Sequence, residues 1–95
     1  MRLGKVSGTV VATRKDPRLE GLKFLVVSTL TPELEPDGAY EIAVDTVQAG
    51  FRETVIIVTG SSARMTERTR EAPVDATIVG IVDEVSLDRA KGDTP

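Results

Sequence analysis

The fold is decided by residues 54–64, which read TVIIVTGSSAR. The residues from Val55 to Val58 form the most apolar run of the chain, and all four are β-branched. Because branching at Cβ restricts χ1, such a run favours an extended strand over a helix. The run stops at Gly60, and a turn of small residues closed by Arg64 follows. The pattern predicts a buried strand that leads into a tight turn rich in hydrogen-bond donors.

Alternating and apolar segments predict four more strands around this one. They cover residues 5–14, 22–30, 40–46 and 76–85. Gly8 lies inside the first of them, where a glycine indicates a bend or bulge that curves the sheet. Residues 61–71 hold the only expected helical turn, and the mixed charges at 67–71 indicate a solvated loop. We therefore expect an all-β fold: a small five-stranded OB-like β-barrel with at most one short helical turn.

Length and composition narrow the functional class. A chain of 95 residues forms one domain with one core, which we place at residues 1–85 and follow with a polar tail at 86–95. The net charge of -3 disfavours a general nucleic-acid binder. Neither cysteine nor histidine is present, so thiolate metal sites are excluded and the usual general base is missing. We expect no catalytic residue, no metal and no cofactor.

The sequence carries no sign of a membrane or secretory segment. No apolar stretch approaches the ~20 residues that a membrane-spanning helix needs. The first residues lack the long apolar centre of a secretory signal. A cytoplasmic protein that does not cross a membrane is the expectation.

Three of the predicted strands are apolar on both faces, namely 22–30, the central run and 76–85. In α/β proteins this pattern means that helices cover both sides of the sheet, but this chain has no sequence left to form such helices. A barrel buries its inner face by itself, so something else must cover part of the outside. Large exposed apolar surfaces are unusual on soluble monomers, and another copy of the chain is the simplest cover. The residues alone therefore predict an oligomer, without giving a copy number.

Two other classes of function stay open on the residues alone. An OB-like binding module would hold an anionic ligand or single-stranded nucleic acid through the cations Arg14, Lys15, Arg18, Lys23 and Arg64. Only three aromatic residues are available for base stacking, so the signal for nucleic acid is weak. An enzyme would use the carboxylates at strand ends, Asp45, Asp75 and Asp83, which otherwise cap turns or pair with arginines.

Five segments of the chain carry a family resemblance. They read LGKVSGTVVAT at 3–13, LEGLKFLVV at 19–27, AVDTVQAG at 43–50, GSSAR at 60–64 and PVDATIVGIVD at 73–83. In this order and spacing they resemble the vertex proteins of bacterial microcompartments, the family of the ethanolamine-utilisation protein EutN and the carboxysome protein CcmL. The resemblance covers nearly the whole chain and departs in the 31–39 loop, the 65–72 loop and the tail.

The resemblance implies a structural protein that is not an enzyme. Its barrels would assemble as a cyclic homopentamer with a narrow central opening and cap the vertices of a polyhedral shell in the cytoplasm. Its partners would be further copies of itself and the hexameric or pseudohexameric shell tiles, because five-fold units supply the curvature that closes a sheet of hexamers.

A five-fold ring needs a heterologous interface, in which one patch meets a different patch of the neighbour. The last strand is one candidate for this interface. The other residues expected at the subunit interface or the central opening are Gly60, Ser61, Ser62, Ala63, Arg64, Asp45 and Gly50. A separate loop is expected to face the shell tiles, and it contains Asp16, Pro17, Arg18, Leu19 and Gly21.

Overall fold

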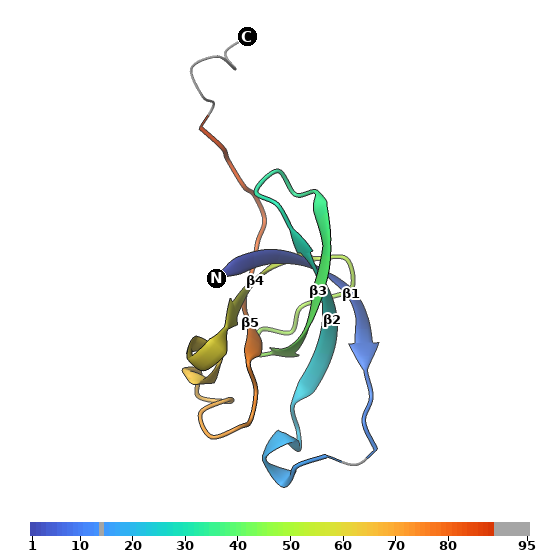
Figure 1. Ribbon diagram of the computed structural model, residues 1–95, viewed down its shortest axis with the longest axis vertical. Coiled ribbons are helices and arrows are strands. Elements are labelled where there is room, and N and C mark those ends of the chain that lie inside the picture. Colours follow the sequence, from blue (N-terminus) through green and yellow to red (C-terminus); the bar gives the residue numbers. More distant parts are fainter. Residues whose placement is uncertain (14, 89–95) are drawn as a thin grey trace.

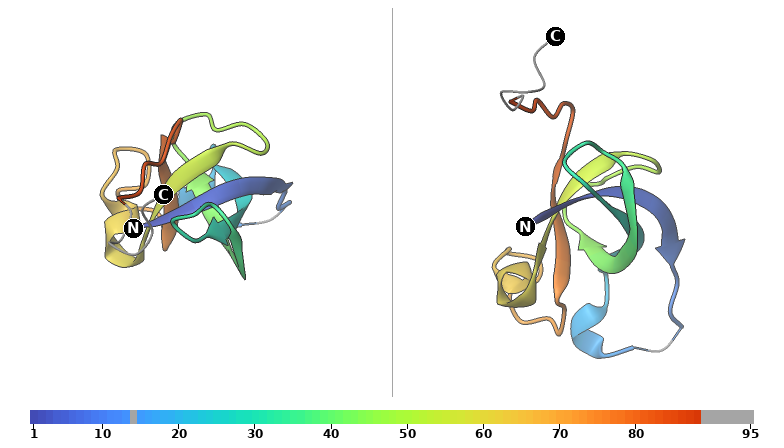
Figure 2. Two further views of the ribbon diagram at one scale, coloured as in Figure 1. Left: turned by 90° about the horizontal axis from the view of Figure 1, so that it is seen from above. Right: turned by 45° about the horizontal axis from the view of Figure 1, so that its top comes forward.

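The computed structural model describes residues 1–13 and 15–88, and within them it has five strands and two short 3-10 turns (Figure 1). The strands are β1 (Arg2–Val10), β2 (Lys23–Leu30), β3 (Pro36–Asp45), β4 (Thr54–Thr59) and β5 (Ala76–Ile81). The turns are η1 (Pro17–Leu19) and η2 (Gly60–Arg64). The strands close into one barrel in the order β1-β2-β3-β5-β4 (Figure 2). The expected all-β, five-stranded barrel is thus confirmed.

The pairing explains how so short a chain closes a barrel. All neighbouring strands are antiparallel except β3 and β5, whose parallel contact joins Val44 to Thr77 and Asp45 to Ile78. The register of β1 against β2 shifts between Val6 and Gly8, which confirms the irregularity expected at the glycine. A bulge of this kind increases strand twist and helps a small sheet to curl on itself.

Several predicted boundaries were wrong. β1 begins at Arg2 because its first residues pair with both β2 and β4, and β3 begins at Pro36, which pairs with Leu30 across the hairpin. β5 ends at Ile81 and not at residue 85, because its partner β4 begins at Thr54. The segment at η1 was expected to be a loop, so the barrel has two short helical turns where at most one was predicted.

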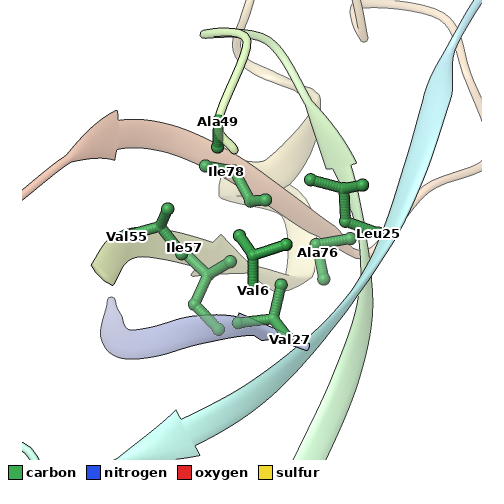
Figure 3. Packing of buried hydrophobic residues seen from close by; sticks show 9 residues of the cluster. Val6, Leu25, Val27, Ala49, Val55, Ile57, Ala76 and Ile78 are labelled. Atoms are coloured by element: carbon green, nitrogen blue, oxygen red, sulfur yellow. The ribbon is translucent and has the colours of Figure 1, made fainter. Parts of the chain in front are cut away.

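The interior is filled by alternate residues of the strands (Figure 3). The buried cluster consists of small and β-branched side chains with one leucine: Val6, Leu25, Val27, Ala43, Ala49, Val55, Ile57, Ala76 and Ile78. Gly4 lies where three strands approach closely, and a Cβ atom at this position would clash with Cγ1 of Val27. Only glycine fits there without displacing a buried side chain.

A second cluster lies on the outside of the barrel, where the chain covers its own strands. It contains Val44, Ala63, Ala72 and Val74, with Leu19, Leu22, Phe24 and Val58 packed against it. We call it the outer cluster. The sequence predicted that something other than helices of this chain must cover part of the outer face; on this side the cover is η2 and the segment that follows it, which belong to the same chain.

Candidate assembly surfaces

The η2 turn is held rigidly at the end of β4. Gly60 has φ +66°, a conformation that glycine adopts without strain, and its N–H donates to the Asp75 carbonyl at 2.9 Å. Ala63 is fully buried, and its carbonyl accepts the hydroxyls of Thr69 and Thr77, both at 2.7 Å. These bonds fix the turn to the loop behind it and to β5. The turn is therefore a pre-formed surface feature of the single subunit.

The exposed part of this turn is small and polar. Ser61 and Ser62 are exposed, and the neighbouring Met65 is 83% exposed. Arg64 turns its guanidinium back onto its own subunit, where Nη1 donates to the Val74 carbonyl at 3.1 Å. The hydroxyls of Ser61 and Ser62 and the thioether of Met65 are thus available for contact with a neighbouring molecule.

The structure separates two residues that were predicted at the same interface. The Asp45 carboxylate is buried and accepts the N–H groups of Val47 and Ala49 at 3.0 and 2.9 Å, so it caps the turn after β3. Gly50 lies beyond that turn, ahead of the start of β4, whereas Gly60 follows the end of the same strand. Asp45 is a structural residue of the subunit, and Gly50 and Gly60 belong to opposite ends of β4.

The loop from Asp16 to Gly21 is built around an ion pair. The Asp16 carboxylate accepts the backbone N–H of Arg18 at 2.8 Å and its guanidinium nitrogens Nε and Nη2, each at 2.9 Å. These side-chain and backbone bonds from Arg18 lower the pKa of Asp16 from 3.8 to about 2. Pro17 and Arg18 are exposed, while Leu19, which was expected in the loop facing the shell tiles, packs against the outer cluster.

This loop meets a second loop that is distant in sequence. Nη2 of Arg68 donates to the Gly21 carbonyl at 3.0 Å, and together the two loops enclose a charged depression of about 380 Å³. Its walls are Arg18, Glu67, Arg68, Arg70, Glu71 and Ala72. The mixed-charge run was interpreted as a solvated loop, and its contact with residue 21 was not predicted. No pattern in the sequence signals a bond between residues 47 positions apart.

A further surface was missed from the sequence. A depression of about 440 Å³ lies on the outer face of β1, where Leu3 pairs with Leu30 on one side and Ile56 on the other. Its lining is completed by Met1, Arg2 and Pro32. We call it the open groove. It is one part of the two-sided apolar pattern that the described chain leaves partly uncovered.

The positions of the candidate residues give little support to an anion-binding module or to an enzyme. Of the cations proposed for an anionic ligand, Arg14 lies outside the described residues. The guanidinium of Arg18 is paired with Asp16, and that of Arg64 donates to the Val74 carbonyl. The ammonium group of Lys15 donates to the Ala12 carbonyl at 3.3 Å and lies 3.7 Å from a carboxylate oxygen of Glu20. Within residues 1–13 and 15–88, no three acidic side chains gather in a way that would hold a metal ion. Across the same residues, no helix has the length and apolarity to span a membrane.

Comparison with known proteins gives a consistent family assignment. The family described as "Ethanolamine utilisation protein EutN/carboxysome" matches residues 1–83. The bacterial microcompartment shell vertex protein GrpN of Rhodospirillum rubrum is 53% identical over 85 residues, which are 90% of this chain and 96% of that protein.

Two solved structures are similar to this chain over most of its length. The pentameric microcompartment shell protein GrpN from Rhodospirillum rubrum superposes with a TM-score of 0.83 at 50% identity, covering 94% of this chain and 100% of that one. The structure of Gloeobacter violaceus CcmL gives a TM-score of 0.89 at 40% identity, covering 98% and 100% of the two chains.

Proposed function

The chain belongs to the EutN/CcmL family, and from this premise we propose that it is a structural shell protein whose pentamers close the vertices of a bacterial microcompartment. The observation that carries the proposal is the likeness to GrpN, a pentameric shell protein that is 50% identical over 94% of this chain. A ring of five supplies curvature that flat hexagonal tiles lack. The proposed role of the chain is therefore to set the shape of the shell, and we propose no enzymatic activity for it.

The uncovered apolar surface supports an assembled state. Leu3, Leu30 and Ile56 line the open groove; Leu30 is buried, and Leu3 and Ile56 keep part of their apolar surface exposed, which burial between subunits would remove from water. Because the η2 turn and the groove are different patches, they suit the heterologous contacts that a ring requires. We propose that the exposed Ser61 and Ser62 lie near the central opening, with Gly60, Ala63 and Arg64 fixing their position.

The loop from Asp16 to Gly21 is our candidate for the contact with neighbouring shell tiles. It is rigid for a loop, because Asp16, Arg18 and the Arg68 bond to Gly21 hold it on both sides. Its exposed surface is charged, which suits a contact that selects its partner by charge complementarity. The partners in this proposal are hexameric or pseudohexameric shell proteins, and the location is the shell itself, in the cytoplasm.

The proposal is tested by co-assembly with purified hexameric shell tiles, imaged by electron microscopy. With the wild-type chain we expect closed polyhedral particles, and without it open sheets or tubes. Ser61→Glu would place five like charges around the opening, so closure should fail at low salt and recover at high salt. Ser61→Gln is the uncharged control and should behave as the wild type. Open sheets in the presence of the wild-type chain would contradict the proposal.

A further inference from the structure

The segment after β5 has the pattern of a strand without a partner. The last backbone bond of the barrel runs from the N–H of Val82 to the Thr54 carbonyl at 2.8 Å. In the described residues after it, up to Asp88, no backbone hydrogen bond is formed. We call residues 82–88 the arm. Figures 1 and 2 show the arm leaving the barrel and running away from it beyond the β2–β3 hairpin.

The arm has one apolar edge and one polar edge. Val85 and Leu87 lie at odd positions, where Val85 is half-buried and Leu87 is 49% exposed. Asp83 is also at an odd position and Val82 at an even one, so the alternation runs from Glu84 to Asp88. Glu84, Ser86 and Asp88 lie at even positions and are exposed. This alternation with period two is typical of a strand that buries one face. Val85 and Leu87 are thus only partly covered within their own subunit.

The open groove matches this arm in shape and charge. Its floor is the row Leu30, Leu3 and Ile56 across three neighbouring strands. Arg2 lines it and forms an ion pair with Asp37 at 3.2 Å, and Lys5 is exposed two residues after Leu3 on the same strand. The arm carries three carboxylates, Asp83, Glu84 and Asp88, and no cation. An acidic strand with apolar side chains complements an apolar groove beside the exposed Lys5.

We propose that the arm of one copy lies in the open groove of the neighbouring copy in the ring. The proposal rests on the proposed pentamer, and it names the contact that links one subunit to the next. Seven extended residues span about 23 Å, which is enough to leave one barrel and cross the row of strands on another. Five such contacts, each from arm to groove, form the closed heterologous cycle of a ring.

A cysteine pair tests the contact directly, because the natural chain contains no cysteine. Leu87→Cys in the arm is combined with Pro32→Cys at the rim of the groove in the full chain. After treatment with a short bismaleimide, which tolerates imperfect geometry, denaturing electrophoresis should show a ladder that rises to five linked chains. The control combines Leu87→Cys with Val11→Cys, which is 92% exposed just beyond the other end of β1. This control should give at least tenfold less linkage between chains.

The outcomes separate the two proposals. A five-copy native mass with no linkage between chains would overturn the arm contact and leave the ring standing. Linkage confined to single chains would show that the arm folds into its own groove, and it would also overturn the contact. A native mass of one copy for the unmodified protein would overturn the proposed function itself.

Discussion

The outer surface of the barrel has two apolar sides, and the chain treats them differently. On one side the η2 turn and the segment after it bury Val44 and Ala63, which are 1% and 0% exposed. On the other side Leu3 and Ile56 are only half-buried and line the open groove. The same strand β4 supplies Val58 to the first side and Ile56 to the second. Two residues on the same face of one strand are thus buried to different extents in the single subunit, and we propose that the second serves assembly.

The difference shows what a two-sided apolar strand means in a small barrel. The pattern predicts that both faces are buried, but it does not predict whether the same chain or a neighbouring subunit buries them. Burial within the subunit contributes to stability at any protein concentration, whereas burial between subunits depends on concentration by mass action. The two sides can therefore be told apart by unfolding experiments on substituted proteins at several concentrations.

The largest loss of subunit stability is expected on the covered side. Val44→Ala removes two buried methyl groups from the outer cluster and should lower the free energy of unfolding by about 2 kcal/mol. The shift should be the same at every protein concentration in urea unfolding followed by circular dichroism. A shift that grows on dilution would mean that Val44 serves assembly, and it would contradict the assignment of the covered side to the stability of the single subunit.

The matched change on the open side is Ile56→Ser. We expect the dissociated subunit to lose less than about 1 kcal/mol, since this side chain is only half-buried in the single subunit. The unfolding midpoint of this variant should instead fall steeply as the protein is diluted, and light scattering should show smaller assemblies. An assembly unaffected by Ile56→Ser would place the interface elsewhere.

The threonines behind η2 give a smaller effect of the same kind. Thr69 and Thr77 both donate to the Ala63 carbonyl, so either single change to valine leaves one bond in place and should cost about 1 kcal/mol. The double variant should cost more than the sum of the two, because it leaves a buried carbonyl without a partner. Thr9→Val on the exposed part of β1 is the control. Strict additivity in thermal unfolding would contradict the shared-acceptor geometry.

The smallest effect concerns the loop at Asp16. Its pKa is lowered from 3.8 to about 2 by the bonds from Arg18, so the ionised form stabilises the folded loop above pH 4, and this contribution is lost as the pH falls toward 2. Arg18→Gln should return the pKa of Asp16 toward 3.8. Carboxyl chemical shifts measured by NMR across this pH range check both values, and a midpoint near 3.8 in the unsubstituted protein would refute the ion pair.

The strands were predictable because alternation and β-branching are local properties of the sequence, as residues 54–59 show. The end of β5 was not, because the apolar run continues past Ile81 to Val82 and only the start of β4 at Thr54 decides where pairing ends. The η2 turn was predictable from Gly60 and the small residues after it. The open groove was not, because Leu3, Leu30 and Ile56 meet only when three strands are in register. The interface roles of Gly60 to Arg64 and of the Asp16 loop stay predictions.

If five copies of this chain form a closed ring, native mass spectrometry of the purified protein will show it. We expect a five-copy mass at micromolar concentration, which breaks down to single chains in Ile56→Ser but persists in Val44→Ala below its unfolding temperature. A single-copy mass for the unsubstituted chain at all concentrations would contradict it.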